Sequence, residues 1–266
     1  MLENWQDKYT AIAFSRRGRV LTIQLNNPDN LNAVGKQMHD ELGRVFSDAA
    51  ADEESDIIVL TGAGRAFSAG GDIAHMQAVV DKPELFLHEA EIAKRIIFSL
   101  LDLEKPIIAK INGHAVGLGA TLALMCDVTF MSRKVKIGDP HVGIGLVAGD
   151  GGAVIWPHLV GFSRAKEFLM TGDLLDASRA AEIGLVNHAV DGDKLDEAVD
   201  AFCDRLAAGS TQAIRWTKTI VNIELKRIAA TVMQAGMAYE TVTAYSADHA
   251  AAVAAFREKR PPVFKK

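Results

Sequence analysis

The chain has 266 residues, of which 49% are hydrophobic and 24% charged, so it can bury the core of one large domain or of a domain with an appendage. A net charge of −5 argues against a polyanion-binding surface, and we therefore expect no nucleic-acid partner. The two cysteines, Cys126 and Cys203, lie far apart without CxxC spacing, which excludes a disulfide framework and fits a reducing cytoplasm.

Two segments bear on the membrane question. Residues 1–10 are polar and lack the apolar core of a signal peptide. Residues 111–125 form a long, weakly charged stretch, but glycines and two polar side chains interrupt it, and Asp127 follows it. We expect this stretch to be buried in a soluble protein, with no membrane contact.

The first part of the chain predicts strands and a helix in alternation. Residues 11–14 and 20–25 have the composition of an opening strand pair, with Arg16–Gly18 as the turn between them. Apolar residues at helical spacing predict a helix over 37–50, and the apolar run 57–61 predicts a buried strand.

The order of strand, loop and helix then recurs. Pro83 is an acceptable first helical residue, and the apolar residues after it predict a long helix that ends near Glu104. Further along, 106–111 and 127–131 predict strands and 118–125 predicts a helix. Short units of this kind favour a layered α/β architecture.

The last part of the chain reads as helix alone. Helical spacing persists over three runs, 198–206, 214–221 and 228–245. We therefore divide the chain into an α/β core, 1–194, and a helical C-terminal region, 195–266. No low-complexity linker separates the two, so we expect one compact unit.

Two glycine-containing turns, at 65–73 and 111–121, each follow an apolar run. Because glycine has no Cβ, it lets backbone N–H groups approach a ligand closely. Two such donors that converge on one carbonyl oxygen form an oxyanion hole, which stabilises the negative charge that develops on a thioester during reaction. The pattern predicts acyl chemistry.

These turns, and the chain from about Arg19 to the tail at 257–261, resemble the crotonase (enoyl-CoA hydratase/isomerase) superfamily. The resemblance implies a spiral of ββα units and a C-terminal helical region that covers the active site and builds a trimer, often doubled to a hexamer. It places the two oxyanion donors at the backbone N–H groups of Gly71 and Leu118. It also implies an acyl-CoA substrate, with no cofactor beyond the CoA of that substrate.

The resemblance further implies where the coenzyme lies. Pantetheine and adenine would contact residues of the loop 30–33 and of the first glycine turn, namely Leu31, Ala33, Ala69, Gly70, Asp72 and Ile73. Lys259 would contact a phosphate, across a subunit boundary or within one chain; the alternative is a solvated charge. His114 has no cysteine or carboxylate at ligand spacing, so we predict no metal site.

The groups that move protons decide which reaction follows. Hydratases of this family hold water with two glutamates, and the corresponding positions here are Thr121 and His141. Thr121 is no base near neutral pH and at most positions a water, or it merely fills space in a helix. His141 titrates near neutrality and can act as acid or base. Asp150, in a glycine-rich run, joins Gly71, Leu118 and His141 as a catalytic candidate. The alternative is that it is the N-cap of the next helix.

Some segments resemble one branch of the family, the β-diketone hydrolase 6-oxocamphor hydrolase, which cleaves a carbon–carbon bond by a retro-Claisen reaction. Residues at the positions of His39, His141, Asp150 and Glu240 belong to its active site. Alternatively, His39 is a surface or packing residue and Glu240 a subunit contact. The parallel is incomplete, because this chain keeps the CoA-type turn at 69–72 that the hydrolase has altered.

Three functions follow from these residues. The first is an enoyl-CoA hydratase/isomerase-family enzyme acting on acyl-CoA thioesters, with His141 and Asp150 as an acid–base pair in place of two glutamates. The second is a retro-Claisen hydrolase of a β-diketone or ring-containing CoA ester. The third is a catalytically silent scaffold that binds CoA esters or a partner. Substrate specificity is expected to depend on a loop at 75–82 and on the C-terminal helices.

Overall fold

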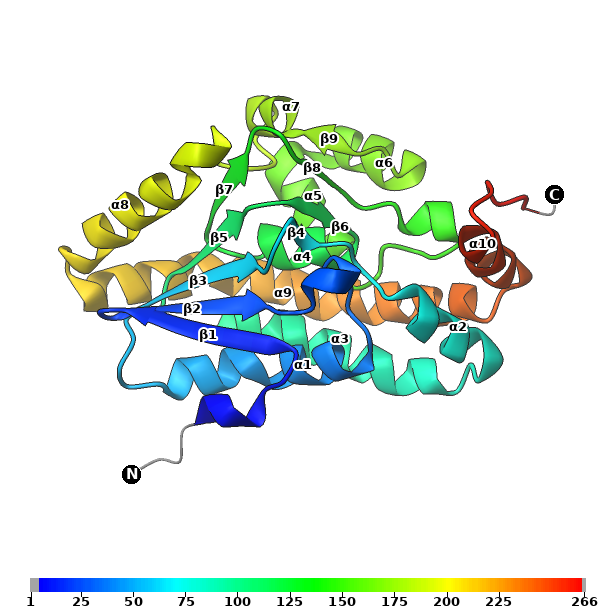
Figure 1. Cartoon of the computed structure of the whole chain (residues 1–266), viewed down its shortest axis with the longest axis horizontal. Coiled ribbons are helices and arrows are strands. Elements are labelled where there is room, and N and C mark those ends of the chain that lie inside the picture. Colours follow the sequence, from blue (N-terminus) through cyan, green and yellow to red (C-terminus); the bar gives the residue numbers. More distant parts are fainter. Residues whose placement is uncertain (1–4, 265–266) are drawn as a thin grey trace.

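The computed structural model describes residues 5–264, which form two β-sheets enclosed by helices (Figure 1). The first four residues of the polar segment 1–10, and the last two residues of the predicted region 195–266, lie outside the described residues. The division of the chain at residue 194 stays a prediction.

The first sheet has six strands in the order β1-β2-β3-β5-β7-β10, and only the β1–β2 pair is antiparallel. Its strands are β1 (Ile12–Arg17), β2 (Val20–Leu25), β3 (Ile57–Gly62), β5 (Ile107–Ile111), β7 (Val128–Ser132) and β10 (His188–Val190). The second sheet has four strands in the order β4-β6-β8-β9. They are β4 (Ala66–Ser68), β6 (His114–Val116), β8 (Lys136–Gly138) and β9 (Leu175–Asp176).

The chain alternates between the two sheets as it advances. Strands β3, β5 and β7 enter the first sheet, and each is followed by a strand of the second sheet, β4, β6 or β8, before the next helix. This arrangement is the predicted spiral of ββα units. The three-residue strands of the second sheet are too short to produce an alternating pattern, so the sequence did not reveal them.

The first turn begins at Gly18, two residues later than predicted. Arg16 and Arg17 lie in β1, and Arg17 pairs with Val20 of β2. Gly18, with a φ of 57°, begins the turn because a left-handed backbone costs glycine little. Arg17 also forms an ion pair with Asp204 at 2.7 Å, which holds it at the strand end.

The remaining elements are helices. They are α1 (Lys36–Ala51), α2 (Ile73–Asp81), α3 (Leu85–Asp102), α4 (Leu118–Leu124), α5 (Gly152–Val160), α6 (Phe162–Thr171), α7 (Ala177–Glu182), α8 (Leu195–Ala207), α9 (Thr211–Ala244) and α10 (Ala247–Arg257). Short 3₁₀ helices lie at Trp5–Lys8, Pro28–Asn30, His141–Ile144 and Gly192–Lys194. The helices predicted at 37–50, near 84–104 and at 118–125 are confirmed within two residues at either end. Pro83 is not the first residue of α3, because Glu84 is the N-cap and the helix begins at Leu85.

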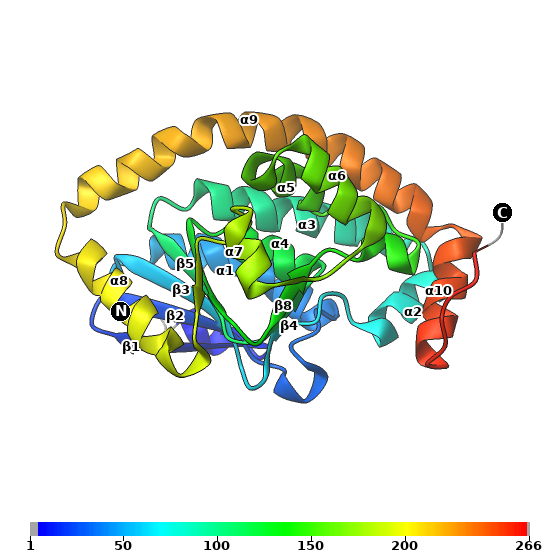
Figure 2. The same ribbon diagram turned by 90° about the horizontal axis from the view of Figure 1, so that it is seen from above.

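The C-terminal region is helical, as predicted, and the last two of its three predicted runs, 214–221 and 228–245, belong to the single helix α9, which ends at Ala244. Figure 2 shows α9 extending along the molecule from α8 at one end to α10 at the other. No helix of the described residues is long and apolar enough to cross a membrane.

Two apolar clusters hold the layers together. The larger one fills the space between the sheets and the helices and includes the fully buried Phe46, Phe67 and Trp156. The smaller one joins the other face of the first sheet to α8, through Val59, Ile108, Phe130 and Val199 among others. Burying each such side chain contributes about 1.5–3 kcal/mol, so packing holds helices against both faces of the first sheet.

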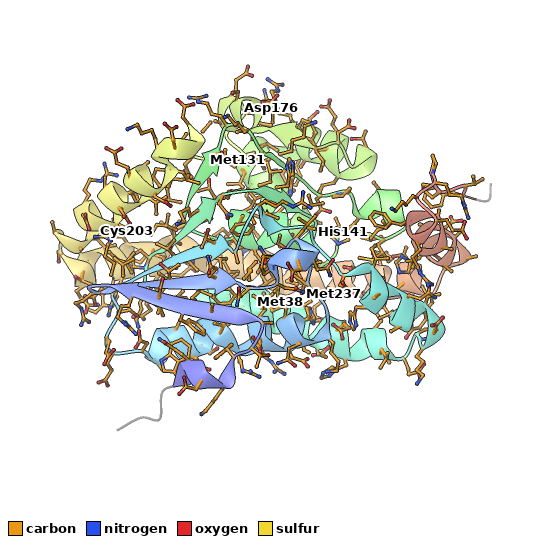
Figure 3. The ribbon with its side chains drawn as sticks, viewed as in Figure 1. Met38, Met131, His141, Asp176, Cys203 and Met237 are labelled. Carbon is orange, nitrogen blue, oxygen red and sulfur yellow. The ribbon has the colours of Figure 1, made fainter. Side chains whose placement is uncertain are left out.

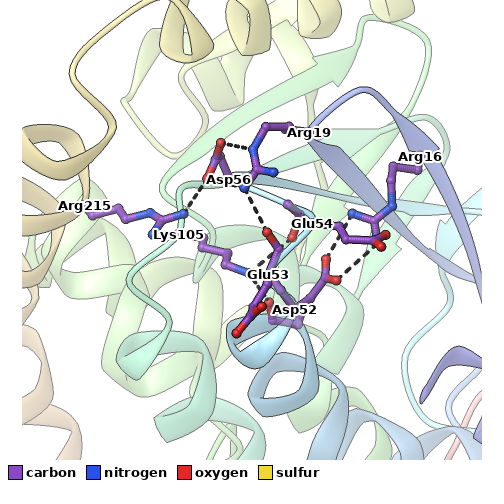
Figure 4. A network of polar contacts seen from close by, with 10 residues as sticks. Arg16, Arg19, Asp52, Glu53, Glu54, Asp56, Lys105 and Arg215 are labelled. Carbon is purple, nitrogen blue, oxygen red and sulfur yellow. Dashed lines mark hydrogen bonds and ion pairs between the residues drawn. The ribbon is translucent and has the colours of Figure 1, made fainter. Parts of the chain in front are cut away.

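A buried polar network locks the end of α1 to β5 and α9 (Figure 4). Lys105 is only 5% exposed, and its ammonium donates hydrogen bonds to the backbone oxygens of Ala49 and Asp52. Burial lowers the pKa of Lys105. Asp56 forms an ion pair with Arg215 of α9 at 2.7 Å. The network is structural and lies away from the cavities described below.

Candidate active site

The two glycine turns meet at one edge of the second sheet. Gly71 follows β4, and Leu118 is the first residue of α4, directly after β6, the parallel neighbour of β4. No backbone carbonyl of residues 5–264 accepts a hydrogen bond from the N–H group of Gly71 or Leu118. Both residues line the same cavity.

The approach of the two turns depends on glycine at two positions. Gly70 has a φ of 82°, and a Cβ added there would lie 2.7 Å from the carbonyl oxygen of Val116. Gly117 has a φ of 55°, and a Cβ added there would lie 3.8 Å from the Cα of Gly70. A side chain would strain the backbone at both positions, and at Gly70 it would also push the two turns apart.

The cavity between the turns, here called the inner cavity, has a volume of about 110 Å³. Apolar side chains form part of its wall, including Val79, Phe86, Leu146 and Met237. Met237 of α9 and His141, both labelled in Figure 3, line this cavity. The ionisable side chains of the wall include His39, His75, Glu89, His141, Asp150 and Glu240. Four of these six side chains were already candidates from the sequence, namely His39, His141, Asp150 and Glu240.

A larger groove of about 550 Å³, here called the outer groove, opens beside the inner cavity. Six of the seven residues predicted to bind CoA line it, namely Leu31, Ala33, Ala69, Gly70, Asp72 and Ile73. Gly71 and His141 line both spaces, so the groove and the cavity adjoin there. Lys259 is exposed and is not among the residues that line the groove, whereas Phe256 of α10 is.

His141 lies between two buried carboxylates. Its Nδ1 contacts the carboxylate of Asp139, which comes directly after β8 and is 1% exposed. Its Nε2 lies 3.5 Å from Oδ2 of Asp150. Burial alone would lower the pKa of His141, but the charges of Asp139 and Asp150 and the hydrogen bond to Asp139 raise it well above its usual value. The imidazolium form is therefore favoured at neutral pH.

Asp150 is a cavity residue and not a helix cap. Helix α5 begins at Gly152 with Gly151 as its N-cap, so the alternative role predicted for Asp150 is wrong. Thr121, which is fully buried on α4, donates a hydrogen bond of 3.4 Å from its hydroxyl to Asp150. Burial raises the pKa of Asp150, opposed by the charge of His141 and by hydrogen bonds from Gly152 N–H and Thr121.

Glu240 of α9 completes this side of the inner cavity. It is 5% exposed, and its Oε2 has no hydrogen-bond partner among the described residues. Burial, together with the charge of Asp150, raises the pKa of Glu240 to about 8, so its neutral form predominates at pH 7. Glu240 is buried within the protomer at the cavity wall, where it faces the acid–base groups.

A second cluster of ionisable side chains is formed by residues from three helices. Nδ1 of His39 on α1 lies 2.6 Å from Oε2 of Glu89 on α3, and Nε2 of His75 on α2 lies 3.3 Å from Oε1 of the same carboxylate. His39 is 7% exposed, so its predicted alternative as a surface residue is wrong. The segment 75–82 is not a loop but most of α2, because the side chain of Asp72 caps that helix by accepting a hydrogen bond from His75 N–H.

Comparisons with known proteins find relatives that match most of the chain. A family model described as enoyl-CoA hydratase/isomerase matches residues 15–266. A crotonyl-CoA hydratase of Syntrophomonas wolfei is 32% identical over 216 residues, covering 80% of this chain and 82% of that protein. The 1,2-epoxyphenylacetyl-CoA isomerase of Escherichia coli is 30% identical over 247 residues, covering 92% and 94%.

The chain belongs to the enoyl-CoA hydratase/isomerase family. The fold is also similar to the solved structure of an enoyl-CoA hydratase/isomerase from Mycobacterium paratuberculosis. It is 33% identical, has a TM-score of 0.88, and the match covers 92% of this chain and 98% of that one. The further similarity to 6-oxocamphor hydrolase stays a prediction.

Sequence reasoning missed four ionisable side chains at the site of this enoyl-CoA hydratase/isomerase family member, which are Asp139, His75, Glu89 and His249. Asp139 stands two residues before His141, and that spacing was the one local signal for a carboxylate beside the imidazole. His75 and Glu89 carried no such signal, because each gains its role only when α2 and α3 pack against α1.

Asp139, His141 and Asp150 also offer three ligand atoms within 4.8 Å of one another, a geometry that a metal ion could use. Since each ring nitrogen of His141 already faces a carboxylate, the arrangement suits a chain of proton-sharing groups.

Proposed function

We propose that this protein is an enzyme that binds acyl-CoA thioesters and catalyses proton transfer on their acyl groups. CoA occupies the outer groove, and the acyl group enters the inner cavity. The observation that carries the proposal is the junction of the two spaces at Gly71 and His141, with Leu118 and Asp150 also lining the inner cavity.

The two amides of Gly71 and Leu118 form the oxyanion hole of this mechanism. They donate hydrogen bonds to the thioester oxygen as it gains negative charge, which favours an enolate-like intermediate. Removing one such donor typically costs about 100- to 1,000-fold in kcat. The oxyanion hole moves no protons, so the reaction requires the ionisable groups beside it.

His141 and Asp150 move the protons. Asp150 accepts a proton from water or from an acyl carbon, and the imidazolium of His141, held by Asp139, stabilises the resulting charges or returns a proton. Thr121 positions Asp150 through its hydroxyl. Glu240, neutral at pH 7, offers a second proton donor to the same space. No cofactor beyond the CoA of the substrate is required by these steps.

The reaction itself is tested with purified protein, a panel of short, long, conjugated and cyclic 2-enoyl-CoA esters, and oxygen-18 water. Liquid chromatography with mass detection separates the outcomes. Label in an intact acyl-CoA identifies hydration, and an unlabelled product of unchanged mass identifies isomerisation. Absence of any conversion across the panel would contradict the proposal.

The roles of His141 and Asp150 are tested by substitution. We expect His141→Ala and Asp150→Asn each to lower kcat by at least about 100-fold while CoA-ester binding persists, because general acid–base catalysis contributes about 10²- to 10⁴-fold. His158→Ala, a histidine exposed on α5, is the matched control and should keep full activity. Full activity in both site variants would exclude the assignment.

The predicted absence of a metal requirement has its own test. We expect activity to be unchanged after dialysis against a chelator, because the steps above use side chains and backbone amides alone. Elemental analysis of the dialysed protein is the accompanying measurement. A loss of activity that Zn²⁺ or Mg²⁺ restores would instead assign Asp139, His141 and Asp150 to a metal site.

A carbon–carbon hydrolase is the second candidate function. It is favoured by one observation, that His39, His141, Asp150 and Glu240 all line the inner cavity, as the predicted similarity to a β-diketone hydrolase requires. Turnover of a free cyclic β-diketone without CoA would support it. A catalytically silent scaffold would bind CoA esters and convert neither class of substrate.

We also propose a homotrimer, or a hexamer made of two trimers, in the cytoplasm. Helix α9 supports self-association because its outer face exposes large apolar side chains, among them Trp216 at 58% and Ile220 at 68%. Contiguous exposed apolar surface of this kind is typical of protein–protein contacts. Nucleic acid and membranes are not expected partners.

A further inference from the structure

The cluster of His39, His75 and Glu89 is not used by the proposed reaction. Its three side chains come from α1, α2 and α3 and all line the inner cavity. The side chains of His39, His75 and Glu89 are 9%, 18% and 13% exposed, so three helices bring ionisable groups out of water at one place. Such burial is costly unless the groups are paired, and here one carboxylate pairs with both imidazoles.

The pairing leaves each imidazole one nitrogen for a ligand. Glu89 engages Nδ1 of His39 and Nε2 of His75, so Nε2 of His39 and Nδ1 of His75 are not used by this carboxylate. Despite burial, the hydrogen bonds and charges of the two histidines lower the pKa of Glu89 well below its usual range. The hydrogen bond to Glu89 in turn raises the pKa of His75. A protonated imidazole beside an ionised Glu89 can donate a hydrogen bond to an oxygen in the cavity.

The rest of the cavity wall limits the charge of that oxygen. No lysine or arginine is among the described residues that line the inner cavity. Asp72, Asp150 and Glu240 add three more acidic side chains to the wall. A carboxylate on the acyl group would therefore meet Asp72 and Asp150, with only imidazoles and no lysine or arginine to offset the added negative charge. A neutral carbonyl or hydroxyl oxygen needs only a hydrogen-bond donor, which an imidazole supplies.

We propose that His39 and His75, oriented by Glu89, bind a neutral oxygen on the acyl group, so that the substrates are oxo- or hydroxyacyl-CoA thioesters rather than plain alkyl ones. This inference rests on the proposed function, because it requires the acyl group to occupy the inner cavity. His39 and His75 are substrate-binding residues, and Glu89 is a positioning residue that acts through them.

The first test compares ligands on the wild-type protein. Dissociation constants are measured by isothermal titration calorimetry for hexanoyl-CoA and 5-oxohexanoyl-CoA, and for octanoyl-CoA and 7-oxooctanoyl-CoA. The two lengths offer the oxygen at two depths, and mass detection verifies that each thioester stays intact. At one length or both, we expect the oxo ester to bind about 10-fold or more tightly than its alkyl partner, the effect of one hydrogen bond to a charged donor.

The second test removes the donors. In His39→Leu or His75→Leu, or in both, the preference for the oxo ester should fall to about 1 while alkyl-CoA binding is retained. Glu89→Gln should reduce the same ratio, because the imidazoles lose their orienting charge. The ratio of two dissociation constants is unaffected by a general loss of folded protein. His88→Ala is the matched control, since that histidine is one residue away on α3 with its side chain 65% exposed, and it should keep the preference.

The outcomes separate this inference from the function on which it rests. If alkyl and oxo esters bind wild type equally, or if the preference survives in both His39→Leu and His75→Leu, the inference is wrong and acyl-CoA binding stands. Tighter binding of adipyl-CoA, which carries a carboxylate, than of 5-oxohexanoyl-CoA also overturns it. If no CoA ester binds at all, the proposed function fails and this inference fails with it. The wild-type comparison needs no variant, so misfolding cannot obscure the result.

Discussion

At the scale of single residues, the inner cavity concentrates ionisable groups that the chain must keep out of water. His141 is stabilised as an imidazolium by two carboxylates, and Glu240, the third acid nearby, avoids a further buried charge by staying protonated. Breaking a buried ion pair by removing one partner typically costs about 3–5 kcal/mol, so Asp139 and Asp150 support the fold as well as the chemistry. The raised pKa values of His141 and Glu240 therefore limit the repulsion between negative charges in the cavity.

Glu240 gives a prediction about stability and pH. The folded protein keeps the Glu240 proton up to about pH 8, whereas the unfolded chain releases it near the ordinary pKa of 4.5. Between these values the folded state binds more protons, so the free energy of unfolding falls as the pH rises. Glu240→Gln cannot titrate. We therefore expect wild type to lose stability relative to this variant between about pH 5 and pH 8, measured by urea unfolding across the range. A difference that is constant with pH would contradict the raised pKa.

At the scale of elements, the site depends on how β4 and β6 deliver their following turns. The two strands are parallel neighbours, so their carboxyl ends reach the same sheet edge, and the turn into α2 meets the turn into α4. Asp72 fixes the start of α2, and that helix then places His75 opposite Glu89. The turn that contains Gly71 and the histidine that faces Glu89 are consequently parts of one continuous segment.

Gly70→Ala tests the contact between the turns. The added Cβ would lie 2.7 Å from the carbonyl oxygen of Val116 in a backbone with a φ of 82°. We expect a loss of about 2 kcal/mol or more in the free energy of unfolding, together with weaker CoA-ester turnover. Gly143→Ala is the control, because an added Cβ there meets nothing within 4 Å. Urea unfolding followed by tryptophan fluorescence measures both. Equal stability of the two variants would show that the turns tolerate separation.

At the scale of the whole molecule, α9 connects the inner cavity to the exposed surface of the protein. Its inner face carries Met237 and Glu240 to the inner cavity, and its outer face exposes Ile220, Val221 and Ile223. One helix therefore serves both the site and the proposed subunit contact, and association of copies would restrain the cavity wall.

The proposed assembly is tested by sedimentation velocity. We expect wild type to sediment as a trimer or hexamer and Ile220→Glu to shift toward smaller species, because a charge would then lie in an apolar contact. Gln212→Glu adds the same charge at another exposed position of α9 and is the control. Sedimentation of wild type as a monomer would contradict the assembly.

The sequence by itself determined the features that short stretches encode. Period and composition were enough for α1, α3 and the strands β2 and β3, and glycine placement was enough for the turns that contain Gly71 and Leu118. His141 and Asp150 were also found from sequence, because family resemblance assigns their positions within the chain. The resemblance likewise pointed to Glu240, although not to its protonation.

Only the tertiary structure decided which of these groups share a space and in what state. His39 and Glu89 are 50 residues apart and carry no common pattern, so their contact exists only because α1 packs on α3. The raised pKa of Glu240 and the imidazolium form of His141 both result from burial and from neighbours far along the chain. Local periodicity reports which face of an element is apolar. It does not report which other element covers that face, and the chemistry of the cavity depends on that covering.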